Sequence, residues 1–372
     1  MAHVNPPYRC DVVGSFLRPK TIAQARVRFT CGQISKEELT AIEDAEIKKL
    51  IAKERENGLS AVTDGEFRRG WWHFDFMWGF NGVDHAAAAH RVAFHDEVTP
   101  ADTATVTGRI SGENHPFVEH FKFVKQFEDE NTVARQTMPS PAQTRFVLTG
   151  NAAAYPYDEF YKNDDELTAD IVAAYRTVIR DLYNAGCRSI QFDDCTWTRL
   201  CDASVRERLG WSDEDALRLQ QENLDVINAV IADQPDDLVI NTHVCRGNFH
   251  STWLSSGGYA PVAAKLFGEE NVDAYYLEFD DDRSGDFAPL AEVSGDKKVV
   301  LGLITSKKPD LEDPDTIKAR IQEAAQYIPL DRLCLSTQCG FASTQEGNKL
   351  TEDQQWAKIA LVQSIAKDVW GE

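Results

Sequence analysis

Short apolar runs and longer amphipathic segments alternate along most of the chain. Runs rich in β-branched residues predict strands, and apolar residues spaced three or four apart predict helices. Strands are predicted at residues 10–16, 59–66, 133–138, 189–193, 239–242, 274–278, 299–303 and 333–337. Helices are predicted at residues 37–58, 166–185, 213–232, 259–268, 315–327 and 354–370.

Eight strands separated mostly by helices are typical of an α/β fold of the (β/α)8 TIM barrel type. We therefore expect a single catalytic barrel over residues 1–372. The pattern loosens between about residues 79 and 131, where we expect an inserted excursion after the second strand. The prolines at positions 139 and 141 are expected to end the third strand, since proline interrupts both central strands and helices.

Composition and charge narrow the class of function. The 372 residues include 39 basic and 60 acidic side chains, a net charge of −21. Such a charge repels nucleic acid and anionic membranes, so we expect small-molecule substrates. The first seven residues lack the basic and apolar regions of a secretory signal. The eight cysteines suit a reducing compartment, so we expect a cytoplasmic protein.

A candidate metal site comes from the strand ends, where barrels of this type carry their chemistry. His243 and Cys245 follow the apolar run 238–240 and are two residues apart, so their side chains point the same way. Glu278 and Cys339 stand at the ends of the sixth and eighth strands. Alone, a His-x-Cys pair in a strand is ordinary packing. Together the four residues predict zinc, which takes these ligand types.

The ligand set favours thiol chemistry. Two thiolates and a carboxylate bring about three negative charges to the ion, which makes zinc a poor activator of water. Such a site suits an incoming thiol, which loses its proton on coordination; loosening of Glu278 would open its position. Glu66 and Asp193 could hold an α-ammonium group, and Gly14 with Ser15 a carboxylate. These contacts describe homocysteine or a similar amino acid.

The strand-end motifs resemble those of the catalytic C-terminal barrel of cobalamin-independent methionine synthase. The order and spacing match over nearly the whole chain, in the segments Val13-Gly14-Ser15-Phe16, Thr63-Asp64-Gly65-Glu66, Ile190-Gln191-Phe192-Asp193-Asp194, His243-x-Cys245, Leu277-Glu278 and Cys339-Gly340. The resemblance implies zinc-dependent methylation of homocysteine to methionine. It implies zinc on His243, Cys245, Glu278 and Cys339, and homocysteine contacts from Ser15, Glu66 and Asp193.

Two features depart from the family pattern. Full-length members carry a second barrel that helps to hold polyglutamyl folate, whereas this chain resembles the short single-barrel homologues. The methyl donor (a folate, a corrinoid or another compound) and an accessory or donor protein are therefore left open. The family also places a proton-donating histidine after the seventh strand, where this chain has Lys307. Lysine, with an ordinary pKa of about 10.4, is a weaker acid than histidine. Lys307 and Asp193 are our candidate catalytic residues.

Each candidate residue also has a plainer interpretation. Trp71 and Trp72 could form a stacking platform for a flat donor such as a pterin, or could pack the excursion onto the barrel. Glu66 and Asp193 could pair with nearby arginines, namely Arg18, Arg68 or Arg69. Cys195 is most simply a small buried apolar residue.

Three other functions are compatible with parts of the pattern. An epoxide:coenzyme M transferase would use the same metal ligands, but its acidic thiol gives Glu66 and Asp193 no ammonium group to bind. A non-catalytic binding or sensing protein would hold zinc in a closed site that is indifferent to thiols. A barrel of the uroporphyrinogen decarboxylase type would hold no zinc at all.

Overall fold

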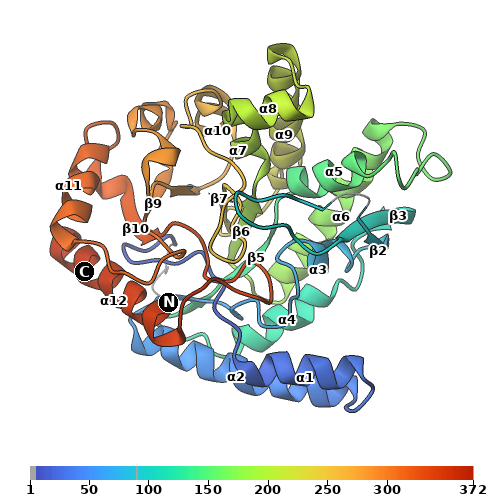
Figure 1. Ribbon diagram of the computed structural model, residues 1–372, viewed down its shortest axis with the longest axis horizontal. Coiled ribbons are helices and arrows are strands. Elements are labelled where there is room, and N and C mark those ends of the chain that lie inside the picture. The colour runs from blue at the N-terminus through green and yellow to red at the C-terminus, as the bar shows by residue number, and fades with distance from the viewer. Residues whose placement is uncertain (1–5, 89–90, 372) are drawn as a thin grey trace.

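The computed structural model describes residues 6–88 and 91–371. Residues 1–5, which belong to the N-terminal stretch without a secretory signal pattern, lie outside the described residues. Strands lie at the centre and helices surround them (Figure 1). The parallel strands are β1 (Ala61–Val62), β4 (Val133–Ala134), β5 (Gln136–Pro139), β6 (Ser189–Asp194), β7 (Val239–Val244), β8 (Ala274–Glu278), β9 (Lys298–Ile304) and β10 (Leu333–Thr337). The arrangement confirms the predicted (β/α)8 fold class.

The strands follow one another in the circular order of such a barrel. Six of them form one parallel sheet in the order β10-β9-β8-β7-β6-β5, and β1 pairs with β4. Only Arg135 separates β4 from β5. Cys10 forms a parallel bridge with Leu335 of β10. Within residues 6–88 and 91–371, residues 10–16 form no regular strand pairing with β1. The two segments are joined by a hydrogen bond in which Phe16 N–H donates to the Gly65 carbonyl at 3.1 Å.

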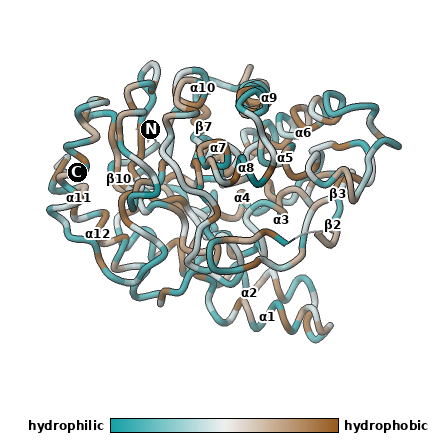
Figure 2. Tube along the Cα trace, turned by 45° about the horizontal axis from the view of Figure 1, so that its top comes forward, coloured by the Kyte–Doolittle hydropathy of each residue, from teal (hydrophilic) through white to brown (hydrophobic). Residues whose placement is uncertain are grey.

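The helices cover the outside of the strands, and their traces alternate between hydrophobic and hydrophilic residues, as in α1 and α2 (Figure 2). This pattern is typical of helices with one buried face. The helices are α1 (Lys20–Thr30), α2 (Lys36–Glu56), α3 (Phe74–Met77), α4 (Pro116–Lys125), α5 (Pro141–Gly150), α6 (Asp164–Asn184), α7 (Thr196–Cys201), α8 (Ala203–Leu209), α9 (Asp213–Ile231), α10 (Ala263–Glu269), α11 (Pro314–Ala324) and α12 (Glu352–Trp370), with short 3-10 turns at Asp282–Ser284, Ala288–Glu292 and Leu330–Arg332.

Several element boundaries differ from the prediction. The first predicted strand is reduced to the bridge at Cys10, because Gly14 adopts a φ of +115° and turns the chain. The helix expected from Tyr259 begins only at Ala263. Helix α5 was not predicted, yet Pro141 occupies its first turn. Proline is tolerated there because backbone N–H groups in the first turn of a helix have no hydrogen-bond partner within the helix.

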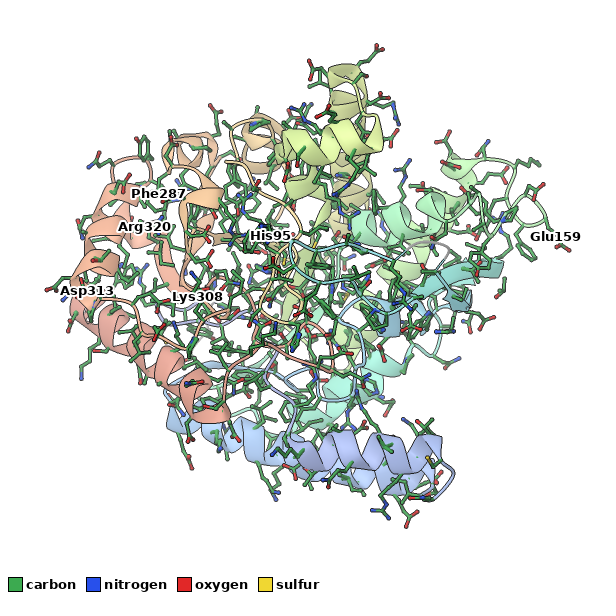
Figure 3. All side chains as sticks on the ribbon, in the orientation of Figure 1. His95, Glu159, Phe287, Lys308, Asp313 and Arg320 are labelled. Carbon is green, nitrogen blue, oxygen red and sulfur yellow. The ribbon has the colours of Figure 1, made fainter. Side chains whose placement is uncertain are left out.

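The segment predicted as an excursion holds two different structures. The antiparallel strands β2 (Asn81–Ala87) and β3 (Asp102–Ser111) form a hairpin. Helix α4, within the same segment, packs against α6 and β4 on the outside of the barrel. Residues 91–101, which precede β3, lie across the barrel mouth, where the His95 ring stacks on Trp253 at 4.2 Å. In Figure 3 His95 lies over the middle of the molecule and Glu159 at its rim.

A buried polar cluster fills the barrel below the strand ends. Arg135 forms an ion pair with Asp11, with both nitrogen–oxygen distances at 2.9 Å. The Tyr276 hydroxyl also donates to Asp11, at 2.8 Å. Tyr276 precedes Glu278 by two residues on the same strand, so its side chain lies one layer deeper on the same side. The space for substrates therefore lies above this layer, at the carboxyl ends of the strands.

Candidate metal centre and substrate cavity

Four predicted ligands converge at the strand ends. His243 is the penultimate residue of β7, and Cys245 follows β7 directly. Glu278 is the last residue of β8, and Cys339 lies two residues beyond β10. One nitrogen, sulfur or oxygen atom from each lies within 4.8 Å of the others, and all four residues are buried. The group could hold a metal ion.

The arrangement of donor atoms fits zinc. The sulfur atoms of Cys245 and Cys339 are 3.7 Å apart. Two sulfurs at the usual Zn–S distance of about 2.3 Å in tetrahedral geometry lie about 3.8 Å apart. His243 Nε2 is buried without a hydrogen-bond partner among the described residues, while Nδ1 lies 3.3 Å from the Tyr276 carbonyl. A proton on Nδ1 would leave Nε2 free for a metal.

The four candidate ligands shift one another's pKa values through charge and hydrogen bonding. Burial alone would lower the pKa of His243, but the neighbouring Cys339 and the charges of Asp193 and Glu278 raise it to about 9. The hydrogen bond from Cys245 holds the pKa of Cys339 well below its ordinary value, despite burial. Burial raises the pKa of Glu278, and the charge of Lys307 opposes that shift. Cys339 is therefore the thiol most readily ionised in this group.

Glu66 lies beside the candidate metal site on a constrained turn. Its φ of +61° is in the left-handed region, and its N–H donates to Asp64 Oδ1 at 2.8 Å. Arg69 lies 3.2 Å from Oε1 and Arg18 4.0 Å from Oε2, so the pairing with these two arginines is present. Oε2 has no hydrogen-bond partner among the described residues. A substrate cation could supply one.

Asp193 faces the same cavity, whereas its neighbour Asp194 does not. Gln191 Nε2 donates to Asp193 Oδ1 at 2.9 Å. Burial, together with the charge of Glu66, raises the pKa of Asp193 to about 8, although the charge of His243 opposes the shift. Asp194 accepts hydrogen bonds from Ser140 and Thr196 and does not line the cavity. The alternation of side chains along β6 explains the difference.

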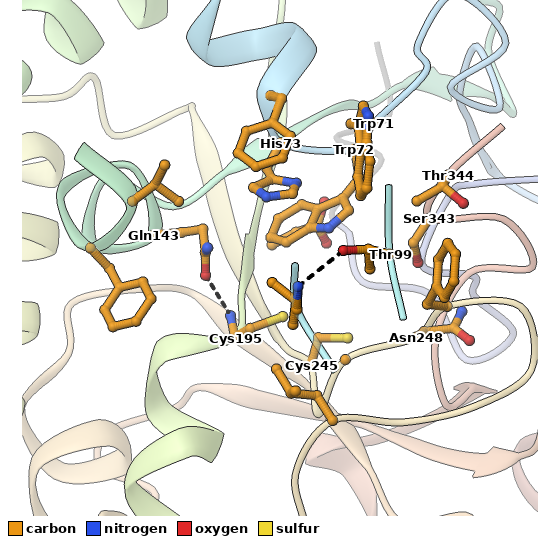
Figure 4. Close-up of a pocket in the computed structure, with 18 of the residues that line it drawn as sticks. Trp71, Trp72, His73, Thr99, Gln143, Cys195, Cys245, Asn248, Ser343 and Thr344 are labelled. Atoms are coloured by element: carbon orange, nitrogen blue, oxygen red, sulfur yellow. Dashed lines mark hydrogen bonds between the residues drawn. The ribbon is translucent and has the colours of Figure 1, made fainter. Parts of the chain in front are cut away.

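One cavity of about 440 Å³ joins these groups. The ligands His243, Cys245 and Cys339 line it, together with the predicted acceptor-binding residues Ser15, Glu66 and Asp193. Trp71 and Trp72 also line it, and Trp72 packs against Cys195, Cys245 and Cys339. Figure 4 shows Cys195 and Cys245 next to each other near the Trp72 ring. Either donor stacking or packing of the loop is compatible with this position of Trp72.

Lys307 is buried outside the lining of this cavity. Its Nζ lies 2.8 Å from Asp280 Oδ2, and both side chains are buried. Its charge contributes to the lowered pKa of Cys339 and opposes the raised pKa of Glu278. The structure therefore places Lys307 behind the metal ligands. Asp280 is buried between Lys307 and Arg283.

Residues 9–361 match the family model described as the catalytic domain of cobalamin-independent synthase. The chain belongs to the cobalamin-independent methionine synthase family. It is 44% identical to uncharacterized protein YxjH of Bacillus subtilis, over 98% of this chain and 95% of that protein. It is 22% identical to a methionine synthase of Saccharolobus solfataricus, over 88% of this chain and 86% of that protein.

Solved structures agree with the family assignment. A candidate vitamin-B12-independent methionine synthase from Listeria monocytogenes has a TM-score of 0.79 and 39% identity, covering 98% of this chain and 99% of that one. A B12-independent methionine synthase from Shewanella sp., solved with selenomethionine, shares the fold at a TM-score of 0.72 and 20% identity, covering 97% of each chain. The predicted resemblance is confirmed, and the family points to a methyltransferase with small-molecule substrates.

Two residues of the cavity in this cobalamin-independent methionine synthase relative were not predicted as functional. Cys195 is buried as expected, but it faces Cys245 and Cys339 rather than a purely apolar core. Its hydrogen bond with Cys245 is the largest cause that raises the pKa of Cys245. The spacing of two residues from Asp193 was the available signal. Arg199 also lines the cavity.

Among the described helices, none is long and apolar enough to cross a membrane.

Gly340 provides a test of Ser15 as an acceptor contact. A Cβ at position 340 would lie 1.9 Å from Ser15 Oγ. Gly340→Ala is therefore expected to displace the Ser15 hydroxyl and to raise KM for the acceptor predicted from the sequence, homocysteine, about tenfold, the cost of one hydrogen bond to a charged group. Zinc content measured alongside steady-state rates separates this effect from damage to Cys339. Gly268→Ala, which meets nothing within 4 Å, is the control; equal KM values in both variants would remove Ser15 from the site.

Proposed function

We propose that the protein is a zinc-dependent thiol S-methyltransferase that methylates homocysteine to methionine. The observation that carries this proposal is a single cavity that joins three of the four residues of the metal-ligand group, His243, Cys245 and Cys339, to two carboxylates suited to an amino acid. Neither feature alone specifies a reaction. A thiol bound at the ligand group would place its amino acid end within reach of Ser15, Glu66 and Asp193.

The acceptor is bound through its two charged ends in this proposal. Glu66 and Asp193 receive the α-ammonium group, which replaces the missing partner of Glu66 Oε2. The Ser15 hydroxyl and the backbone N–H groups at Gly14 and Ser15 receive the carboxylate. Arg69 and Arg18 keep Glu66 in place from the other side. This pattern favours homocysteine over coenzyme M, which has no ammonium group.

Zinc, when bound by His243, Cys245, Glu278 and Cys339, would supply the Lewis acidity that keeps a thiol deprotonated at neutral pH. Lys307, held against Asp280, contributes fixed positive charge behind Glu278 and Cys339. Because Lys307 does not line the cavity, we assign it an electrostatic role in place of direct proton transfer to the leaving group. Trp71 and Trp72 provide an apolar wall that excludes water from the donor.

The expected cellular setting is a reducing one. All eight cysteines lie in the described part of the chain and are free. Thiolate ligands must be reduced to hold zinc, so the proposed chemistry suits the cytoplasm. A small methyl donor, or a separate protein that delivers one, would enter through the cavity mouth.

A screen of acceptors and donors tests the proposal. Zinc-loaded protein is mixed with homocysteine and, in turn, methyltetrahydrofolate, its polyglutamyl forms, methylcobalamin and simple methyl sulfonium compounds. Methionine is measured by mass spectrometry. We expect methionine with at least one donor. In a parallel reaction with coenzyme M and an epoxide, we expect no alkylated product. Zinc-loaded protein that forms methionine with none of these donors, or that alkylates coenzyme M, would contradict the proposal.

A further inference from the structure

Arg199 is a partly buried arginine in α7 that lines the cavity. Its Nε atom is buried without a hydrogen-bond partner, and among the described residues no acidic side chain forms an ion pair with it. Other buried arginines near the site are paired, as Arg69 is with Glu66 and Arg135 with Asp11. Because Nε is buried and no acidic side chain pairs with the guanidinium, an anion that enters the cavity would stabilise its charge.

The nearest charged neighbours do not satisfy Arg199. Cys195 and then Asp194 favour the charged form of Arg199, but neither forms an ion pair or hydrogen bond with it, and the Asp194 carboxylate is already occupied by Ser140 and Thr196. The guanidinium lies over the Phe146 ring, with its carbon 4.3 Å from the ring centroid. Phe146 in turn meets Trp211 edge to face at 6.4 Å. Stacking fixes the plane of the guanidinium and leaves its N–H edge available for an anion.

The charge of the cavity wall makes this arginine distinctive. Among the described lining residues, Arg199 is the sole lysine or arginine, beside the acidic residues Glu66, Asp102 and Asp193. An anionic group that enters the cavity therefore has one strong partner. A chain of several anionic groups would meet carboxylates elsewhere on the wall.

We propose that Arg199 is the anion-binding residue of the cavity and receives one compact anionic group, a carboxylate, sulfonate or phosphate, carried by the methyl donor. The assignment to the donor rests on the proposed function, because Ser15, Glu66 and Asp193 already account for both ends of the acceptor. Arg199 is then a specificity residue for the donor. It selects a donor that combines a ring, for Phe146 and Trp211, with a single anion.

Binding of a simple probe tests this assignment without turnover. Benzoate and benzamide have nearly the same shape and differ in charge. Each is titrated into zinc-loaded protein while tryptophan fluorescence is followed, since Trp71, Trp72 and Trp211 line the cavity. We expect the wild-type protein to prefer benzoate, and Arg199→Met to weaken benzoate binding about tenfold or more while benzamide binding stays unchanged. The benzoate affinity of Arg199→Lys should lie between those of the wild-type protein and Arg199→Met.

Arg180→Met is the matched control, because Arg180 is exposed on helix α6 and does not line the cavity. It should bind benzoate as the wild-type protein does. Equal loss of both probes in Arg199→Met would assign Arg199 a purely structural role and overturn the proposal. Failure of the wild-type protein to bind benzoate, or to prefer it over benzamide, would overturn it as well.

A competition experiment identifies the substrate that carries the anion. If the anion belongs to the donor, saturating homocysteine leaves the benzoate affinity unchanged, because the two occupy different walls. Mutual exclusion would assign Arg199 to the acceptor and contradict the donor proposal. Benzoate binding is measured without a methyl donor, so its result stands or falls separately from the methyl-transfer assay.

Discussion

Replacing Cys339 with serine is expected to lower the zinc content well below one ion per chain and to abolish methyl transfer. Cys339 Sγ lies 3.7 Å from Cys245 Sγ, and the pKa of Cys339 is the one depressed by its neighbours. A serine hydroxyl stays protonated at neutral pH and is a poor zinc ligand. Metal analysis of the purified variant and a methionine assay measure the two effects.

Cys334→Ser is the control for the loss of a buried thiol. Cys334 lies five residues earlier, in β10, and packs against Val13, Tyr276 and Val300 away from the metal ligands. This variant should lose some stability but keep its zinc and its catalytic rate. A Cys339→Ser protein with full zinc and full activity would refute Cys339 as a ligand.

Asp193→Asn is expected to raise KM for homocysteine by about 10- to 150-fold, equivalent to the roughly 1.5–3 kcal/mol of a hydrogen bond to a charged group. The variant keeps the size of the side chain but removes the charge that would face the substrate ammonium group. Zinc content should stay at the wild-type level, because Asp193 is not one of the four ligands. Steady-state kinetics with varied homocysteine measure the change.

The pH dependence provides a second signature of Asp193. Burial raises the pKa of its carboxyl group to about 8. The ionised form, which binds an ammonium group, therefore becomes less populated as the pH falls below about 8. Homocysteine affinity of the wild-type protein should weaken over that range, and Asp193→Asn should lack this part of the dependence.

Asp194→Asn is the matched control, since it changes the adjacent carboxylate, which bonds to Ser140 and Thr196 outside the cavity. It should destabilise the fold and leave KM for homocysteine near the wild-type value. An Asp193→Asn variant with an unchanged KM would contradict the assignment of Asp193 to the acceptor.

The regular elements of the fold were predictable where a single period dominates the sequence. Strands β6 to β10 are continuous buried runs, and helices α6 and α9 bury one face. The boundaries that differ depend on backbone geometry that periodicity does not report. Gly14 turns the first strand away, and Pro141, expected only to end the third strand, also begins a helix. Whether a proline ends or begins a helix depends on the capping residue before it, here Ser140.

The candidate site was predictable to the extent that it lies on strand ends. His243, Cys245, Glu278 and Cys339 lie at or just beyond the ends of β7, β8 and β10, and alternation of side chains favours their convergence. Residues on loops and short helices were harder to place. The sequence does not reveal that Lys307 turns behind the ligands to meet Asp280. It also does not reveal that Arg199 lacks an acidic partner, since pairing depends on the whole three-dimensional environment.

The proposal that a metal in this site takes up the acceptor thiol is tested most directly by zinc X-ray absorption spectroscopy. Zinc-loaded protein is measured with and without homocysteine. With Cys245 and Cys339 as ligands, we predict two sulfur neighbours at about 2.3 Å from zinc, and a third when homocysteine is added. A spectrum that homocysteine leaves unchanged would contradict the account and indicate a closed, structural zinc site.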